Sequence, residues 1–397
     1  MSYARKRTTK QPRRSDVRAK KAKIDELSES EAESSQNAPL SISVEVVLTS
    51  PAPRGRRQTV VTESGEKFAI VKPIAEGTFG KVYHVTDKKK KAWAMKLSKN
   101  CDDVAFFHDH EKNITDRIGR ENHKNLMPLC TFGKLETKVE DCAQWMILMP
   151  LLGPSVREVM KRAAESMTGV IHSFPVEDIF NIGKQLLEAI EVLDTLGIAH
   201  LDLKPENMLF NNPNLNVKLK KVDDNTYHTV VNDLHIKLGD YGSTGVFTKG
   251  KTHFSEVQTR CYRAPEIFLG LPYTHTTDIW SVGCILTELY TGKILFNGPK
   301  SEPNRPSEIA QFFMMMAVLN KKPSRDQIAK ASRSQKYLDI LDNKSWEDEI
   351  GPFPLLMDNI RKGDTNYNVE HLFCVINYFL SFDPNSRPAA YLARRHL

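Results

Sequence analysis

The amino-acid sequence predicts an α+β fold in which a small, β-rich part precedes a larger and mainly helical part. Residues 67–97 alternate apolar and polar side chains with the period of β-strands. Residues 175–197 carry an apolar stripe at helical spacing, and residues 276–289 are apolar almost throughout, as in a helix at the centre of a core. With 397 residues, of which 40% are hydrophobic, the chain is long enough for one two-lobed domain and a tail.

The positive charge of the chain is concentrated at its N-terminus. Residues 1–23 hold ten Lys and Arg against one Asp, a local charge of +9, so the other 374 residues sum to −2 (7 minus 9). Residues 24–35 are acidic and rich in serine, and residues 50–57 consist of Ser, Pro, Ala, Gly and Arg. Such a composition buries too little apolar surface to offset the entropy of ordering, so we predict disorder over residues 1–60.

The basic cluster of residues 1–23 suits a nuclear-import receptor, which predicts a nuclear protein. A solvated spacer in a cytoplasmic protein is the alternative, and we expect no direct binding to nucleic acid. The longest apolar runs have about half of the roughly 20 residues that a membrane span needs, so no membrane partner is expected. The N-terminus lacks the apolar core of a secretory signal, and the six cysteines show no paired spacing, which favours reduced intracellular thiols.

Three strands are predicted at the start of the domain, near residue 67. Turns at residues 76–80 (EGTFG) and 87–91 (DKKKK) separate the alternating segments, which indicates an antiparallel meander. Gly77 and Gly80 would let backbone amides lie close over a nucleotide triphosphate, because no side chain blocks the approach. An ordinary β-turn is the alternative.

Lys96 ends the third strand in an apolar setting, where an ammonium group is unfavourable unless it is paired. Residues 103–120 read as a weakly amphipathic helix with a single glutamate, Glu111. This glutamate lies on the same face as Ile114 and Ile118, so it is the candidate partner of Lys96. A solvated glutamate is the alternative.

A buried strand and a long helix connect this β-rich part to a polar loop. Residues 141–153 read as a strand and a short linker, which makes residues 67–150 an N-lobe and residues 151–397 a C-lobe. The helix begins with Pro175 and ends at Gly197, and it delivers the loop that follows.

The loop of residues 200–242 carries groups suited to holding metal-bound phosphates. Asp202 is placed to accept a hydrogen bond from an attacking hydroxyl, and Lys204 to steady a transferring phosphate. Asn207 and Asp240 offer the hard oxygen ligands that Mg²⁺ prefers. Each of these residue types also forms ordinary turns, but the whole string in this order favours phosphoryl transfer.

These motifs, HLDLKPEN and GDYG, resemble the catalytic and metal loops of eukaryotic protein kinases. The resemblance implies a bilobal protein-kinase fold over residues 67–397, with ATP and Mg²⁺ as cofactors. It makes Asp202 the catalytic base, with Lys204 beside it in a context typical of serine/threonine kinases. It also makes Asn207 and Asp240 the metal ligands.

The same resemblance assigns the nucleotide contacts. Lys96 would hold the α- and β-phosphates while pairing with Glu111, and Met149 would lie at the back of the adenine pocket. Pro150 lacks an amide donor, so backbone contacts to the base must come from its neighbours. The nucleotide-binding residues implied are Ala75, Gly77, Gly80, Val82, Lys96, Met149, Leu151 and Leu152.

Three positions depart from the kinase pattern. Ala75 stands where a glycine is usual, so the strand end is tighter there. Leu201 replaces the arginine that commonly receives an activation-loop phosphate, so we predict activity without that phosphorylation. Tyr241 replaces phenylalanine and adds a hydroxyl that needs a hydrogen-bond partner.

The later segments resemble the LAMMER (Clk) dual-specificity kinases, through GDYGST and QTRCYRAPEIFLG. Residues 211–238 contain two alternating segments, which predict an extra hairpin. The resemblance implies that Arg387 pairs with Glu266 and that Asp278 holds the backbone of the catalytic loop. The stretch AQFFMMMAVLN, where the naming signature of the family falls, keeps two Met positions but not the flanking charges.

We therefore expect a protein kinase that transfers the γ-phosphate of ATP to Ser/Thr hydroxyls, with Tyr as a further acceptor. The LAMMER resemblance implies Arg/Ser-rich splicing proteins as substrates. A kinase similar to casein kinase 1 and a kinase-fold scaffold without catalysis are the alternatives.

Overall fold

The fold is described from a computed structural model of the full chain. The structure describes residues 43–46, 58–77, 80–100, 103–128, 130–247, 253, 255–298, 307–331, 355–359 and 367–397. The chain divides into two units, Met1–Ile42 and Ser43–Leu397, and all described residues belong to the second. The basic cluster predicted to be a tail therefore lies outside the described residues.

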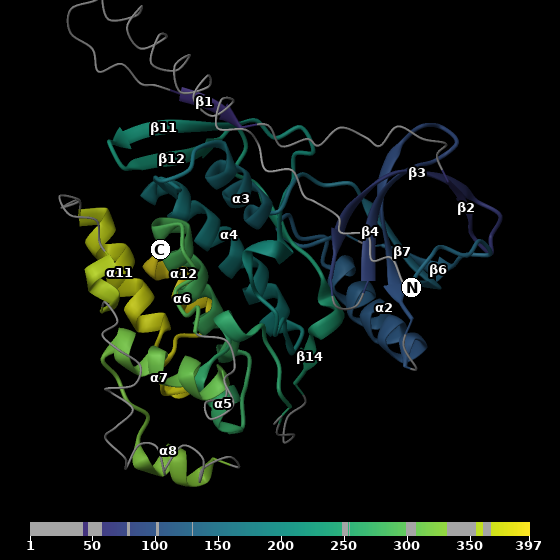
Figure 1. Cartoon of the computed structure of the whole chain (residues 1–397). Helices are drawn as coiled ribbons and strands as arrows, with labels where there is room; N and C mark the ends of the chain where they lie inside the picture. Colours follow the sequence, from purple (N-terminus) through teal and green to yellow (C-terminus); the bar gives the residue numbers. More distant parts are fainter. Residues whose placement is uncertain are drawn as a thin grey trace, which may run out of the picture. The chain divides into compact units, whose positions relative to one another are not determined.

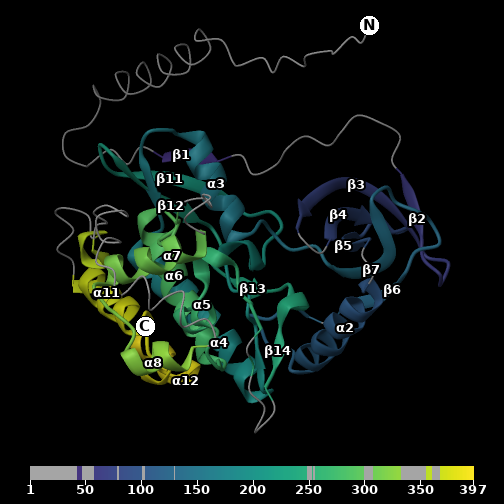
Figure 2. The same cartoon turned by 60° about the horizontal axis from the view of Figure 1, so that its bottom comes forward.

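A curled antiparallel sheet forms the first lobe (Figure 2). Its strand order is β2 (Thr59–Val61), β3 (Lys67–Glu76), β4 (Gly80–Thr86), β5 (Ala92–Lys99), β7 (Cys142–Pro150) and β6 (Thr131–Lys134). The predicted meander is confirmed as β3, β4 and β5, which pair in succession. The strands pack over a core that includes Phe68, Val85, Met95 and Leu148.

Helix α2 (Val104–Arg120) lies beside this sheet in both views, against β5 and β7 (Figures 1 and 2). Its buried side chains include Ile114 and Ile118, as the sequence predicts. His108 packs inward as well, and its ring lies 4.5 Å from the ring of Trp145 on β7. These contacts fix which face of α2 points toward the sheet, and therefore the direction of Glu111.

Helices make up most of the described part of the second lobe (Figure 1). They are α3 (Val156–Ser166), α4 (Val176–Thr195), α5 (Pro265–Leu269), α6 (Thr276–Thr291), α7 (Ser307–Leu319), α8 (Arg325–Lys330), α11 (Tyr367–Phe379) and α12 (Ala390–His396). Helix α6 is buried from Thr277 to Tyr290 and packs against α4 and α11. Because α6 is enclosed on all sides, it is a fixed base for the loops that lie on it. No helix among the described residues is long and apolar enough to span a membrane.

Two short antiparallel ladders frame the polar loop. Strand β9 (Ile198–Ala199) pairs with β14 (Gly245–Val246), and β10 (Met208–Phe210) pairs with β13 (Ile236–Leu238). Residues 200–207 therefore run between β9 and β10, while Asp240 follows directly after β13. The two ladders bring these segments side by side.

The predicted extra hairpin is confirmed as β11 (Val217–Asp223) and β12 (Thr226–Val231). Strand β8 (Ile171–Ser173) pairs in parallel with β12 on one side. On the other side, β1 (Ser43–Val46) pairs antiparallel with β11, with Val44 opposite Leu219. The hairpin thus becomes the centre of a four-stranded sheet in the second lobe.

Strands β1 and β2 correct the prediction of disorder at residues 43–46 and 58–60, whereas residues 1–42 and 47–57 lie outside the described residues. Strand β2 also extends the first sheet upstream of the predicted start at residue 67. Residues 43–46 form a strand, and the pairing of β2 with β3 begins at Thr59. The physical reason is that both segments satisfy their backbone hydrogen bonds on open sheet edges, at β11 and at β3. The polar composition of the whole 60-residue stretch masked these two short apolar segments.

Candidate active site

Two carboxylates hold the side chain of Lys96. Its Nζ lies 2.8 Å from Oε1 of Glu111, 3.0 Å from Oε2 of Glu111 and 2.8 Å from Oδ1 of Asp240. Burial alone would lower the pKa of Lys96, but the carboxylates of Asp240 and Glu111 raise it above its usual value. The ammonium is therefore charged, and it joins β5, α2 and the loop after β13 at one point.

Asp240 adopts a left-handed backbone conformation with φ of 61°, which non-glycine residues seldom occupy. Burial tends to raise the pKa of its carboxyl, but the charge of Lys96 outweighs it and lowers the pKa below the usual value. The hydroxyl of the next residue, Tyr241, donates to the carbonyl of Leu238 at 2.9 Å and accepts from the N–H of Met127 at 3.0 Å. The partner predicted for this hydroxyl is thus the backbone of the neighbouring segments.

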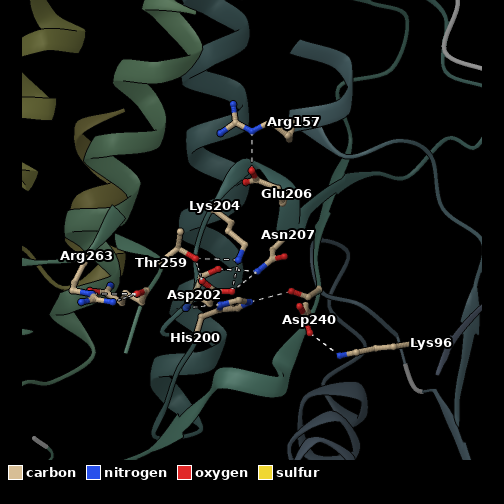
Figure 3. Close-up of polar contacts among 12 residues, drawn as sticks. Lys96, Arg157, His200, Asp202, Lys204, Glu206, Asn207, Asp240, Thr259 and Arg263 are labelled. Carbon is tan, nitrogen blue, oxygen red and sulfur yellow. Dashed lines mark hydrogen bonds and ion pairs between the residues drawn. The ribbon is translucent and has the colours of Figure 1, made fainter. Parts of the chain in front are cut away.

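The carboxylate of Asp202 is held from two sides (Figure 3). Thr259 donates its hydroxyl to Oδ1 at 2.6 Å, and Lys204 donates to Oδ2 at 2.6 Å. Lys204 also donates to the hydroxyl oxygen of Thr259 at 3.1 Å, which closes a triangle. Asn207 adds bonds from Nδ2 to the carbonyl and to Oδ2 of Asp202, at 2.8 and 3.3 Å. These bonds fix the direction of the Asp202 carboxylate.

Asp278, at the start of α6, binds the backbone of the loop that carries Asp202. Its carboxylate accepts the N–H groups of His200 at 2.7 Å and Leu201 at 3.0 Å, as expected from the resemblance. Burial raises the pKa of Asp278 to about 6, although the bonds to both N–H groups oppose the rise. Leu201 has φ of 60° and is buried, so both the backbone and the side chain of this position are fixed.

His200 joins the two loops of the site. Its Nδ1 accepts the N–H of Asp202 at 3.2 Å, and its Nε2 lies 3.1 Å from the carbonyl oxygen of Gly239. The proton therefore lies on Nε2, which donates to Gly239 directly before Asp240. The ring thus connects the backbone of Asp202 to the backbone directly before Asp240 and fixes the two segments relative to each other.

The donor atoms of Asn207 and Asp240 fit a magnesium ion. Asn207 uses its amide nitrogen for Asp202, which leaves its amide oxygen available to a metal, and Asp240 uses only Oδ1 for Lys96. Within the described residues, no group of three or more His, Cys, Asp or Glu side chains is placed to hold a metal. A hard ion with two protein oxygens typically completes its shell with phosphate and water, so the pair suits a metal that arrives with a nucleotide.

Other residues predicted to contact a nucleotide lie on the same sheet as Lys96. Val82 is opposite Lys96 in the pairing of β4 with β5 and opposite Ala75 in the pairing of β3 with β4. A Cβ atom at Gly80 would meet the carbonyl oxygen of Leu97 at 2.5 Å, so this position requires glycine.

The hinge residues predicted to contact the base continue from this sheet. Met149 lies near the end of β7, and Leu151 and Leu152 continue the chain into the second lobe; all three are half-buried. Gly77 donates its N–H to the carbonyl of Gly80 at 2.9 Å, while residues 78 and 79 between them lie outside the described residues.

Sequence reasoning missed Thr259 and Arg157. Thr259 is 57 residues away from Asp202 along the chain, and only its place five residues before Ala264 in the RAPE motif signalled a role. Arg157 on α3 donates to Glu206 of the same loop at 2.9 Å (Figure 3). An arginine near the start of an amphipathic helix carries no signal of such a contact.

Residues 68–397 match the protein kinase domain family, and the chain belongs to this family. The solved kinase domain of PF14_0431 covers 85% of this chain at a TM-score of 0.63 and 25% identity, and the chain covers 95% of that structure. The fold is therefore the protein kinase fold, with the β-rich and helical lobes described above.

The curated relatives include serine/threonine and dual-specificity kinases. Serine/threonine-protein kinase AFC2 of Arabidopsis thaliana is 28% identical over 345 residues, which cover 83% of this chain and 76% of that protein. Dual specificity protein kinase CLK2 of Homo sapiens is 29% identical over 333 residues, 81% of this chain and 62% of CLK2. Probable dual specificity protein kinase madd-3 of Caenorhabditis elegans is 30% identical over 329 residues, 81% of this chain but 34% of that protein. The chain is thus a serine/threonine protein kinase with relatives of the Clk type, as the LAMMER resemblance predicts.

Proposed function

We propose that this kinase transfers the γ-phosphate of ATP to serine and threonine hydroxyls of proteins, with Asp202 as the base that accepts the hydroxyl proton. The observation that carries the proposal is the convergence of Lys96, Asp202, Asn207 and Asp240, from three separate segments, on one site. Phosphoryl transfer depends mainly on positioning and on neutralising negative charge, which these groups provide.

Each residue has one task in this proposal. Lys204 donates to Asp202 and is close enough to neutralise charge on the transferring phosphate. Lys96, held by Glu111, neutralises the α- and β-phosphates. Magnesium, bound by Asn207 and Asp240, would neutralise the remaining phosphate charge.

The nucleotide base occupies the other end of the proposed ATP site. The turn of Gly77 and Gly80 covers the phosphates, and Ala75 and Val82 lie over the sugar and base. Met149 closes the back of the adenine pocket, and the backbone of Leu151 and Leu152 binds the base edge. Pro150 contributes no N–H group.

Transfer of radiolabelled phosphate to a generic protein substrate tests the catalytic assignment. We expect Lys96→Met and Asp240→Ala each to lose roughly 100-fold or more of the wild-type activity, as typical for removing one charged group from a transition state. Lys99→Met is the matched control, since Lys99 lies on the same strand and pairs with Glu76 at the surface. Equal incorporation in all four proteins would mean that the activity belongs to a contaminant.

A second measurement tests the metal ligands without requiring turnover. ATP should raise the melting temperature of the wild type more in the presence of Mg²⁺ than in EDTA. Asp240→Ala should remove this difference, because it removes one of the two proposed ligands. An unchanged magnesium effect in that variant would exclude Asp240 as a ligand.

For the substrate, we propose Arg/Ser-rich proteins as the first class to test, with tyrosine as a second acceptor. Support comes from the similarity to CLK2 and madd-3, whose names describe dual specificity. An oriented peptide library reports the acceptor and its flanking preference together. Selection of neither arginine nor serine around the acceptor would exclude this class.

For the location, we propose the nucleus, with an import receptor bound to the basic cluster of residues 1–23. The support is its local charge of +9, which comes from ten Lys and Arg and one Asp. Deletion of these residues from the full chain should shift a fluorescent fusion toward the cytoplasm. An unchanged distribution would count against the proposal.

A further inference from the structure

A buried carboxylate lies close to the candidate active site and has no role in the chemistry proposed above. Glu288 on α6 is 1% exposed, and Tyr262 above it is 3% exposed. The hydroxyl of Tyr262 donates to Oε2 of Glu288 at 2.6 Å. An ionised carboxylate at this depth is unfavourable unless a cation accompanies it.

Arg157 on α3 supplies the cation. Its Nη1 donates to Oε1 of Glu288 at 2.6 Å, its Nη2 to the hydroxyl of Tyr262 at 2.6 Å and its Nε to Oε1 of Glu206 at 2.9 Å. All three guanidinium nitrogens are therefore engaged, in the planar arrangement that such a group favours. Glu288, Tyr262 and Glu206 therefore form a binding site for a guanidinium group, and Arg157 of the same chain occupies it.

This guanidinium site lies beside the loop of Asp202, where the proposed kinase reaction would place the acceptor hydroxyl of a protein substrate. Glu206 sits between Lys204 and Asn207, four residues after Asp202, and Tyr262 follows three residues after Thr259. In the view of Figure 3, Arg157 and Glu206 lie beyond Lys204, away from Asp240. An extended peptide advances about 3.3 Å per residue, so we expect a substrate side chain a few positions from the acceptor to come within reach of Glu206.

Glu206 forms the exposed end of the guanidinium site, which is the end that a substrate can approach. The side chain of Glu206 is 43% exposed, whereas that of Arg157 is 25% exposed. Two carboxylates and one guanidinium leave a net charge of −1, compared with −2 if Arg157 were absent. Without the arginine, the same carboxylates and the tyrosine hydroxyl would form an acidic subsite with the geometry to bind a guanidinium.

We propose that Arg157 occupies this acidic subsite from within the chain and so weakens selection for a basic residue at the substrate position that passes Glu206. This inference rests on the proposed protein kinase function. Arg157 is a specificity residue and takes no part in phosphate transfer. Arginines of an Arg/Ser-rich substrate must then be recognised at other positions.

An oriented peptide library compared between wild type and Arg157→Ala tests the proposal. We expect one substrate position to gain selection for Arg and Lys by roughly tenfold, the effect of one well-formed ion pair at a binding interface. Adding Glu206→Gln to Arg157→Ala should reduce this gain, because it removes the exposed carboxylate. Arg162→Ala is the matched control, since Arg162 lies on the same helix and pairs with Glu158 and Glu165 there. A folded, active Arg157→Ala with wild-type preferences would overturn the proposal.

A second variant guards against a failure to fold, because Arg157→Ala leaves Glu288 buried without its cation. Arg157→Ala with Glu288→Gln keeps a neutral partner for Tyr262 and leaves Glu206 without the internal arginine. We expect this double variant to gain basic selection at the same position, by less than Arg157→Ala. No gain in the folded double variant would also overturn the proposal.

Peptide binding without ATP separates this proposal from the proposed catalysis. The probe is a fluorescent peptide with alanine in place of the acceptor and arginines on both sides, followed by anisotropy. We expect the variant with Arg157→Ala and Glu288→Gln to bind this peptide several-fold more tightly than wild type. The difference in affinity should shrink at high salt. Equal affinities would contradict the role of Arg157, whereas a wild type that binds peptide but transfers no phosphate would contradict only the proposed function.

Discussion

Arg387 and Glu266 form a two-point ion pair inside the second lobe. Nη1 of Arg387 lies 2.6 Å from Oε1 of Glu266, and Nη2 lies 2.7 Å from Oε2. Both side chains are almost completely buried, and Thr277 donates a further hydrogen bond to Oε1 at 2.6 Å. The pair ties the segment that follows Thr259 to the C-terminal part of the chain, and Thr259 in turn contacts Asp202.

Removing one partner of this pair should destabilise the protein strongly. Arg387→Ala leaves the Glu266 carboxylate buried without a cation, which costs roughly 3 to 5 kcal/mol. Urea unfolding of the purified kinase measures the change. Arg394→Ala is the control, because Arg394 pairs with Glu191 at the surface and its loss should cost less than about 1 kcal/mol. Similar losses of unfolding free energy in both variants would show that the buried pair contributes no more to stability than a surface pair.

The contribution of Asp194 and Asp278 to the stability of the folded protein should fall as the pH rises from about 4 to 7. Burial raises the pKa of Asp194 to about 7, despite a hydrogen bond from the N–H of Ala390, and burial raises that of Asp278 to about 6. In the unfolded chain both groups titrate near 3.9, so the folded state binds more protons in this interval. The contribution of these two groups to stability then decreases with rising pH, because the carboxyls must ionise while buried.

Asp194→Asn tests the sign of this dependence. The amide stays neutral, so the variant should be more stable than wild type at pH 8, by on the order of 2 kcal/mol, and similar at pH 5. Urea unfolding at the two pH values gives both numbers. Asp224→Asn is the control, since the bond from Lys221 lowers the pKa of Asp224 and keeps its titration below this interval. A variant with the same pH dependence as wild type would exclude Asp194 as the source.

Activity should not require phosphorylation of the activation segment. Leu201 is 2% exposed and contacts Gly245. This position therefore offers no arginine to bind a phosphate on the activation segment. We expect protein treated with a phosphatase, which is then removed, to keep its kcat within about twofold. A tenfold loss that reverses on incubation with ATP would show that another cation takes the place of the missing arginine.

The sequence was sufficient for features that depend on neighbouring residues. The helix face of Glu111 and the alternation of β3 to β5 follow from periods of about 3.6 and 2 residues, which local patterns carry. Strand β1 could not be predicted, because only the edge of β11, about 170 residues later, gives it a partner. Contacts such as Arg157 with Glu288, 131 residues apart, likewise depend on tertiary packing rather than on any local pattern.

Thr259 is the long-range contact with the most direct consequence for the rate. Its hydroxyl donates to Asp202 at 2.6 Å and accepts from Lys204 at 3.1 Å, so it fixes the direction of the proposed base. Thr259→Ala should lower kcat by roughly 10- to 100-fold through misplacement of that base, while KM for ATP stays near its wild-type value. Thr259→Ser keeps the hydroxyl and should recover most of the rate.

The steady-state kinetics of these variants separate positioning from folding. Thr274→Ala is the control, because Thr274 is exposed and its hydroxyl bonds only with its neighbour Thr276 among the described residues. A hydroxyl that merely stabilised the fold would lower the melting temperature without the selective loss of kcat. If Thr259→Ser were as slow as Thr259→Ala, the hydroxyl would not position Asp202, and the contact between them would be incidental to catalysis.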